Sequence, residues 1–426
     1  MNLEKLFAHS EQLVRTRLVL MLSYYIDLIH CDDRAGFVNT LAFLFKGLAM
    51  ESTEKAFALQ CADAIKVYLE GNSFLGKFPG VVNDLLPFTF TLIEKSNQIF
   101  PILQTMIMKH KLELGGASHL IEQLLKRVNI ECQVHSKKSS MSILQSLRII
   151  SEFAKNRETA VWLEPYLKEI CYYLTILNSI EFEDDIMEIL HHYMTSTKKS
   201  FTLFKDILKY LPQIYKKSNR HISFNLFALI NCGFEYAQEV LEENIEPMVT
   251  FILEIMATKH NDEDTGRLQG SLLIQLFMQM PWGHKIDSFI PLILQNTLQL
   301  LKTESDSITK QGLVNNILIA IYGYTDIALP ILEKRKTLEE VLTIISKAQI
   351  LKESYDIKVY VLGVTCILSR ISSSVIDKLG PELFASMIKV LVANYKEELR
   401  KTESLEGSES EDSCDVRIVI KSRMMT

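Results

Sequence analysis

The sequence predicts an all-α protein, an α-solenoid built from about ten helical hairpins of the HEAT or armadillo kind. Three observations support this prediction. Apolar residues recur with a helical period along the body of the chain, without a convincing alternating strand pattern. Glycine and proline are scarce, at 16 and 10 of 426 residues, which leaves few sites for tight β-turns. Seven of the prolines recur about every 42 residues, close to the length of such a hairpin.

The helical pattern can be followed segment by segment. Breaks at 71–80 and 136–140 interrupt it, the first with glycine and the second with polar residues. The segment 53–69 is amphipathic, and Ser52 is a candidate N-cap for it. We expect helices at 11–30, 34–50, 53–69, 81–95, 100–111, 119–128, 141–156, 161–178 and 181–195, with further helices from Phe201 onward.

The prolines indicate a repeat. They are Pro87, Pro165, Pro212, Pro247, Pro291, Pro330 and Pro381. We expect each near a helix start, where the missing N–H would have no intrahelical partner. The intervals are 78, 47, 35, 44, 39 and 51 residues, and the first spans two repeats. These intervals agree with the roughly 40–47 residues of a HEAT or armadillo unit.

The stretch from Asp356 to Ile371 is apolar on nearly all sides and predicts an inner helix with neighbours on both flanks. Its polar residues Lys358, Thr365 and Ser369 form one narrow stripe at helical spacing. A buried strand is the alternative, because many of the residues are β-branched, but about sixteen residues without a turn signal favour a helix. The opening Asp356-x-Lys358 predicts a ladder of carboxylates and ammonium groups between neighbouring inner helices.

Charge separates the chain into a balanced body and an acidic end. The net charge is −6, and the segment from Glu403 to Asp415 contains six acidic residues and no basic one. We therefore expect a HEAT-repeat α-solenoid at 1–400 and an acidic, disordered tail at 401–426. A nucleic-acid-binding protein would carry the opposite, basic field, so direct nucleic-acid binding is not expected.

Composition also bears on the cellular compartment. No apolar run approaches the ~20 residues that span a bilayer, so we expect no membrane association. The seven cysteines are scattered without a CxxC pair. This pattern favours reduced thiols in a cytosolic or nuclear protein.

The sequence offers no catalytic motif. It has neither a phosphate-binding glycine loop nor a GxSxG nucleophile elbow. Glu188-x-x-His191 has the spacing of a di-iron ligand pair, but a di-iron bundle needs a second pair that the chain does not supply. We therefore interpret His191 and His192 as a surface pair and expect no metal, cofactor or enzymatic activity. The alternative, an α-helical enzyme, requires a buried polar constellation that the sequence does not reveal.

Two acidic groups are candidate binding residues for basic protein cargo. The first comprises Glu181, Glu183, Asp184 and Asp185. The second lies in the tail and comprises Glu403, Glu406, Glu409, Glu411, Asp412 and Asp415. The helical pattern at 181–195 predicts that Asp184, Asp185, Glu188 and His191 face solvent. A solvated helix face and a solubilising linker are the alternatives to a polyanion that attracts basic cargo such as ribosomal proteins or histones.

Four stretches of sequence carry a resemblance to a known family. They are VRTRLVLMLSYYIDL with EKAFALQCADAIKVYL, then LPFTFTLIEKSNQIFPILQTMI, then MSILQSLRIISEFAKN with SIEFEDDIMEIL, and finally DIKVYVLGVTCILS. In this order they resemble the C-terminal half of importin-β-type karyopherins, closest to the importin seven and eight branch. The resemblance spans most of residues 11–412 and consists of apolar patterns rather than invariant chemistry.

The resemblance implies a nuclear transport receptor that binds protein cargo and phenylalanine–glycine nucleoporins under control of the small GTPase Ran. Such a protein moves between cytoplasm and nucleus through nuclear pores. The family's N-terminal repeats, which hold most Ran contacts, have no counterpart here, and the acidic stretch after Lys401 is short. We therefore expect a fragment or short form, for which the resemblance carries over cargo binding but not autonomous control by Ran. The alternative is a HEAT-repeat scaffold or adaptor without a transport role.

Overall fold

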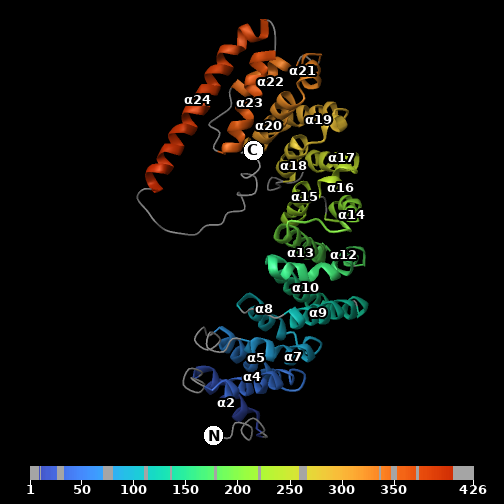
Figure 1. The fold of residues 1–426 in the computed structure, drawn as a ribbon, viewed down its shortest axis with the longest axis vertical. Helices are drawn as coiled ribbons and strands as arrows, with labels where there is room; N and C mark the ends of the chain where they lie inside the picture. The colour runs from blue at the N-terminus through green and yellow to red at the C-terminus, as the bar shows by residue number, and fades with distance from the viewer. Residues whose placement is uncertain are drawn as a thin grey trace. The chain divides into compact units, whose positions relative to one another are not determined.

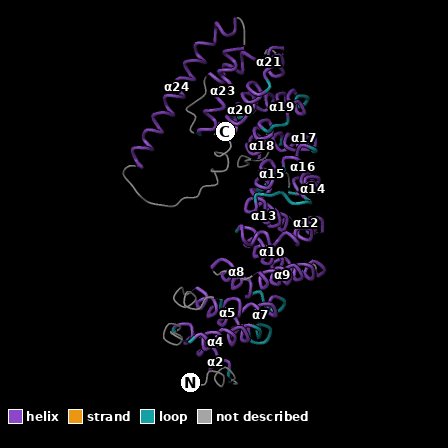
Figure 2. Tube along the Cα trace, viewed as in Figure 1, coloured by secondary structure: helices purple, strands orange, loops and turns teal. Residues whose placement is uncertain are grey.

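A computed structural model shows an all-α protein, as the sequence predicts (Figure 1). It describes residues 9, 11–25, 33–70, 80–109, 114–134, 137–176, 180–218, 222–258, 266–334, 337–346, 353–370 and 374–405. These residues are 87% helical and include no strand, and Figure 2 shows the helices joined by short loops. The chain divides into two compact units, Met1–Met248 and Val249–Thr426.

The first unit is a two-row array of helices. Its helices are α2 (Gln12–Tyr24), α4 (Arg34–Leu48), α5 (Lys55–Glu70), α7 (Val81–Ile93), α8 (Ile99–Lys109), α9 (Leu114–Val134), α10 (Lys137–Lys155), α11 (Arg157–Ala160), the 3-10 helix η1 (Val161–Tyr166), α12 (Leu167–Ile176), α13 (Ile180–Thr197), α14 (Phe204–Lys217), α15 (Phe224–Tyr236) and α16 (Gln238–Glu242). In the inner row, α2, α5, α8, α10, α13 and α15 pack each against the next. The outer row contains α4, α7, α9, η1 with α12, and α14.

The second unit has the same plan. The division between the units falls within α17 (Ile245–Ala257). The helices that follow are α18 (Gly266–Gln279), η2 (Gly283–Ile286), α19 (Ile290–Thr303), α20 (Ser307–Gly323), α21 (Thr325–Lys334), α22 (Leu338–Ser346), α23 (Ser354–Arg370) and α24 (Ser374–Leu405). The inner row is α18, α20 and α23, the outer row is α19, α21 and α22, and α24 packs against both α22 and α23.

One kind of hydrogen bond, from an asparagine amide to an aspartate, joins inner-row helices in both units at the same spacing along the sequence. In the first unit the Asn225 amide donates to Asp184 at 3.0 Å, and these residues are 41 apart. In the second unit the Asn315 amide donates to Asp356 at 2.7 Å, and these residues are also 41 apart. The donor to Asp356 is therefore an amide and not the predicted ammonium group. The spacing agrees with the proline period and with a helical-repeat architecture, while the HEAT or armadillo type stays a prediction.

The prolines recur at the predicted interval, but most of them do not lie at the predicted position near a helix start. Two lie in the first turns of helices, Pro247 in α17 and Pro291 in α19. Five lie further inside helices: Pro87 in α7, Pro165 in η1, Pro212 in α14, Pro330 in α21 and Pro381 in α24. The prediction of a helix start is wrong for four of these five, whereas Pro165 lies two residues before α12 begins at Leu167. Most of their rings are exposed, so water can hydrate the carbonyl that loses its donor, which lowers the cost of an internal proline.

Several predicted boundaries also differ from the structure. The helix predicted at 119–128 is longer, because α9 runs from Leu114 to Val134, and α5 begins at Lys55, so Ser52 is not its N-cap. The break at 136–140 ends by residue 136, because α10 begins at Lys137 and the lysines and serines there are compatible with a helix. The helix predicted at 161–178 begins as the 3-10 helix η1 and becomes α-helical only after Tyr166. Pro165 has no N–H for the next bond of an α-helix, which explains this change.

The helix α23 confirms the one predicted at Asp356–Ile371, and it packs against α20 and α24 as expected. Its burial is less complete than predicted, because Leu362 is 44% exposed. The helix that is buried on all sides is α20, in which every residue from Gly312 to Ile321 is buried. It lies between α18 and α23 in the inner row and also packs against α19 and α21.

Candidate functional site: an apolar pocket between two outer helices

An apolar pocket of about 520 Å³ lies in the first unit, between the outer helices α12 and α14. It is lined by Pro165, Lys168, Glu169, Cys171, Tyr172, Leu203, Asp206, Ile207 and Tyr210. The volume falls within the roughly 300–1,000 Å³ of small-ligand pockets, and the walls are mostly aliphatic or aromatic. Tyr172 is 59% exposed and Tyr210 is 38% exposed, so the pocket opens to solvent between two aromatic rings.

Two matching stripes of side chains build the pocket. On the first side, Pro165, Lys168, Glu169 and Tyr172 follow the spacing i, i+3, i+4, i+7. On the second side, Leu203, Asp206, Ile207 and Tyr210 follow the same spacing. Residues at this spacing lie on one face of a helix, so docking α12 beside α14 brings the two faces together.

The polar residues of the pocket are already engaged at its edge. Glu169 accepts hydrogen bonds from the Asn129 amide at 2.6 Å and from the Tyr173 hydroxyl at 2.9 Å. Asp206 forms an ion pair with Lys209 at 3.0 Å. Burial raises the pKa of Cys171 to about 12, so its thiol is neutral and acts as an apolar wall. The pocket therefore suits an apolar side chain, with polar groups available at the rim for a peptide backbone.

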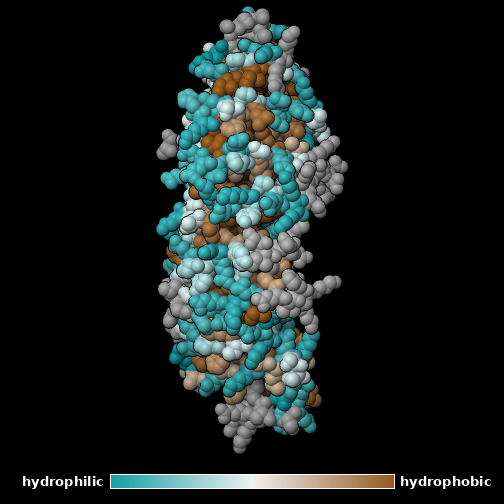
Figure 3. Space-filling model, turned by 90° about the vertical axis from the view of Figure 1, so that its right-hand side faces the viewer, coloured by the Kyte–Doolittle hydropathy of each residue, from teal (hydrophilic) through white to brown (hydrophobic). Residues whose placement is uncertain are grey.

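The surface of the chain combines apolar and hydrophilic residues. Figure 3 shows one face of the chain, on which apolar residues occur as patches separated by hydrophilic ones. Small separate apolar sites of this kind suit a ligand that presents single apolar side chains along a polar chain. They are less suited to one large apolar partner surface.

The acidic residues predicted at the start of α13 are less available than the sequence suggests. Glu183 is only 3% exposed and has Lys217 of α14 at 3.5 Å. Asp185 was predicted to face solvent, but it is 9% exposed and lies 3.5 Å from Arg148 of α10. Burial raises the pKa of both carboxyl groups, and that of Asp185 reaches about 6. Neighbours in both rows thus reach residues at the edge of the apolar stripe of α13, the outer helix α14 at Glu183 and the inner helix α10 at Asp185.

Asp184 is half-buried and is held by Asn225 of α15. Glu181 lies in α13, but its side chain is outside the described residues. The tail candidates cannot be placed either. Glu403 lies in the last turn of α24 without a described side chain, and Glu406, Glu409, Glu411, Asp412 and Asp415 lie outside the described residues. Their proposed role in cargo binding stays a prediction.

The histidine pair of α13 belongs to a partly buried charge network. Glu188 lies 3.4 Å from both His192 and Lys155 and accepts a hydrogen bond from Ser151 at 3.1 Å. The His192 hydrogen bond is the largest of the effects that lower the pKa of Glu188 to about 2. His191 is half-buried, and desolvation lowers its pKa to about 4. The surface pair predicted from the sequence is thus partly covered, and Glu188 serves to link α13 to α10.

The part of the chain that the structure describes contains no cluster of metal-binding side chains and no disulfide. Within the described residues, no three histidine, cysteine, aspartate or glutamate side chains lie close enough together to hold a metal ion. Five cysteines have described side chains, and all five are free thiols. In the same part of the chain, none of the helices has the length and apolar character needed to cross a bilayer.

Comparisons with known proteins add no family to this picture. No protein-family model and no curated protein matches the chain. The sequence did not predict the pocket, because Tyr172 and Tyr210 belong to different hairpins and meet only through packing. One sequence pattern could have indicated the pocket. The spacing i, i+3, i+4, i+7 occurs on two successive outer helices and ends each time in an exposed tyrosine.

Proposed function

We propose that this chain is a nuclear transport receptor of the importin-β type, with the α12–α14 pocket as a docking site for phenylalanine–glycine nucleoporins. The observation that carries the proposal is the solvent-open apolar pocket between two consecutive outer helices, with a tyrosine on each side. A phenylalanine ring buries a large apolar area there and can pack against either tyrosine ring.

The form of such a ligand matches the form of the pocket. Phenylalanine–glycine segments present isolated aromatic side chains on a flexible, polar chain. The ring would enter between Tyr172 and Tyr210, and glycine lets the backbone approach the rim closely. A single shallow site gives weak binding, and several sites acting together raise the overall affinity while exchange stays fast.

Protein cargo would bind elsewhere on the array. The acidic tail residues would attract basic cargo such as ribosomal proteins or histones. Ran would regulate the chain only through those repeats that keep their contacts with Ran. Because exposed charges are screened over ~8 Å at physiological ionic strength, cargo capture should weaken as salt rises. A pulldown of a basic ribosomal protein that gives equal yield at low and high salt would contradict this part of the proposal.

The pocket is tested with a synthetic peptide of phenylalanine–glycine units in polar spacers, titrated against the full chain and followed by fluorescence anisotropy. We expect saturable binding, and no binding of the matched serine–glycine peptide. The double variant Tyr172→Ser/Tyr210→Ser should weaken binding roughly fivefold or more, because it removes both aromatic walls. A pair of exposed tyrosines at the end of α2, outside the pocket lining, provides the matched control, Tyr24→Ser/Tyr25→Ser, which should bind as the wild type does.

Equal affinity of the pocket variant and the control variant would overturn the pocket assignment, provided that both melt at the wild-type temperature. The alternative function is a helical-repeat scaffold or adaptor, which the two-row architecture also suits. A fluorescently tagged chain should accumulate at the nuclear rim if it is a transport receptor. Uniform exclusion from the rim, together with no peptide binding, would favour the scaffold.

A further inference from the structure

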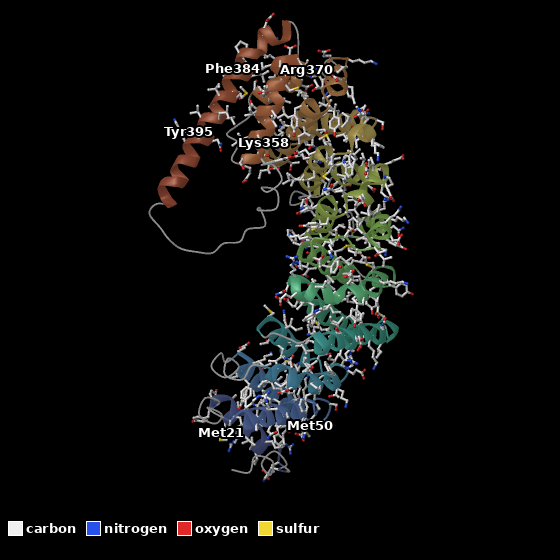
Figure 4. The ribbon with its side chains drawn as sticks, in the orientation of Figure 1. Met21, Met50, Lys358, Arg370, Phe384 and Tyr395 are labelled. Atoms are coloured by element: carbon white, nitrogen blue, oxygen red, sulfur yellow. The ribbon has the colours of Figure 1, made fainter. Side chains whose placement is uncertain are left out.

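The helix α24 has two apolar faces, and among the described residues only one of them is covered. Leu379, Leu383 and Val390 are buried, on the face that packs against α22 and α23. A second face carries Phe384, Ile388, Leu391, Val392 and Tyr395, which are 53%, 42%, 38%, 46% and 65% exposed. Figure 4 shows Phe384 and Tyr395 on the side of α24 turned away from α23. A row of large apolar residues at helical spacing marks an interaction site more often than single exposed residues do.

The exposed face has the pattern of a short coiled-coil seam. Phe384, Ile388, Leu391 and Tyr395 follow at intervals of four, three and four residues, the alternation of d and a positions in a heptad. The next seam positions on either side are Pro381 and Glu398, neither of which continues the row of large apolar residues. The seam therefore has a defined length of about three helical turns.

The seam is also symmetric when its direction is reversed. Its residues read aromatic, aliphatic, aliphatic, aromatic in both directions, and the intervals are the same in both directions. We propose that a second copy of this chain covers the exposed face, with the two α24 helices antiparallel about a twofold axis. In this register Phe384 lies against Tyr395 of the second copy, and Ile388 lies against Leu391 of the second copy. A twofold interface requires such a self-complementary patch.

The apolar area that the exposed face of α24 can bury indicates how tightly two copies should associate. Five half-exposed side chains offer on the order of 400 Å² per copy, about half the ~800 Å² per partner of a standard stable interface. The dimer should therefore be reversible and depend on concentration in the micromolar range or above.

The experiment measures the association of the full chain by sedimentation velocity over a range of concentrations. We expect a monomer–dimer equilibrium that Ile388→Lys weakens roughly tenfold or more, since it places a charge in the centre of the seam. Ile308→Lys is the matched control, because Ile308 is also exposed, at 65%, but lies in α20 outside the seam. A chain that stays monomeric up to hundreds of micromolar, or a dimer that Ile388→Lys leaves unchanged, would overturn the proposal.

Charges placed within the seam test the register. The single variants Phe384→Lys and Tyr395→Glu should each weaken the dimer roughly tenfold or more, because each places a charge against an aromatic ring of the other copy. An equimolar mixture of the two variants should associate more tightly than either variant alone, since the antiparallel register brings the two introduced charges of opposite sign together. Failure of the mixture to recover would overturn the antiparallel register.

A deletion separates this dimer from a contact with the chain's own acidic end. Removal of residues 406–426 should leave the dissociation constant within about twofold of the wild-type value, and loss of the dimer would assign the exposed face to that segment instead. The dimer does not depend on the proposed transport function. Peptide binding at Tyr172 and Tyr210 should be unaffected by Ile388→Lys, so either proposal can fail while the other stands.

Discussion

The helices α13 and α20 hold equivalent places in the two units but are fixed there by different chemistry. Each is flanked in its inner row, α13 by α10 and α15 and α20 by α18 and α23. α13 meets its neighbours through charges, including Asp185 with Arg148 and Glu188 with Lys155. α20 meets its neighbours through aliphatic side chains and buried amides, among them Asn315 and Asn316, which are each 1% exposed.

The comparison shows which features of an inner helix follow from its position in the array and which follow from its own sequence. Two flanking helices cover both sides of an inner helix whatever its sequence, so polar residues at the stripe edge must find partners there. In α13 those partners are ionic, and the energy of packing depends on protonation. The buried polar residues of α20 itself are uncharged, although Asn315 donates to the carboxylate of Asp356, and most of the packing energy depends on shape.

The largest expected effect is a loss of packing around α20. Leu318 is fully buried, and Leu318→Ala should lower the free energy of unfolding by about 3 kcal/mol, since it removes buried methyl groups and leaves a cavity. Urea unfolding followed by circular dichroism measures this loss. Leu362→Ala on the neighbouring helix α23 is the control, because that leucine is 44% exposed and its removal should cost about 0.5 kcal/mol or less.

A double variant tests the packing contact between α20 and α23. A Cβ atom at Gly363 would lie 2.6 Å from Cδ2 of Leu318, so Gly363→Ala in the wild type forces a clash between α23 and α20. In the Leu318→Ala background the same change should cost less, because Cγ and Cδ2 of residue 318 are gone and only its Cβ, 2.9 Å from the added Cβ, remains in close contact. Strict additivity of the two changes would contradict the close approach of the two helices.

The next effect is a pH dependence specific to α13. The pKa of His191 falls from an ordinary value near 6.5 to about 4 on folding, so the unfolded chain binds the extra proton first on acidification. Stability should therefore decline as the pH falls from about 7 toward 4, by about 2 kcal/mol between pH 7 and pH 5. His191→Gln should remove this part of the decline, measured as urea unfolding at both pH values.

Asp185 acts in the opposite direction over much of this range. Its folded pKa is raised to about 6, so its unfavourable contribution is relieved as the pH falls. The difference between wild type and His191→Gln isolates the histidine, since Asp185 is present in both. Parallel pH profiles of the two proteins would show that His191 is not held neutral by the fold.

The smallest effect compares the two amide–carboxylate bonds of the inner rows. Asn315→Ala leaves the half-buried Asp356 without the 2.7 Å donor and should cost about 1–2 kcal/mol, because burial already raises the pKa of this carboxyl group. Asn225→Ala removes the corresponding 3.0 Å donor to Asp184 and should cost about half as much, since other charged groups surround α13. Equal losses in differential scanning calorimetry would argue that the two rows are not held differently.

The helices and their period follow from the sequence because both are local. Apolar spacing places the helices, and prolines about 42 residues apart set the repeat even though most do not begin a helix. The solvent-facing assignment of Asp185 failed for a physical reason. A helical wheel gives the direction of the apolar stripe but not the breadth of the surface that neighbouring helices cover.

The sequence by itself determined that this protein is a succession of amphipathic helices with a repeat near 40 residues. Local hydrogen bonding and apolar periodicity are sufficient for that. Only the tertiary structure decided that Tyr172 and Tyr210 share a pocket, that Asp185 is buried, and that one apolar face of α24 is left open. Each of these depends on which helix lies beside which, and the pattern of a single helix does not specify its neighbours.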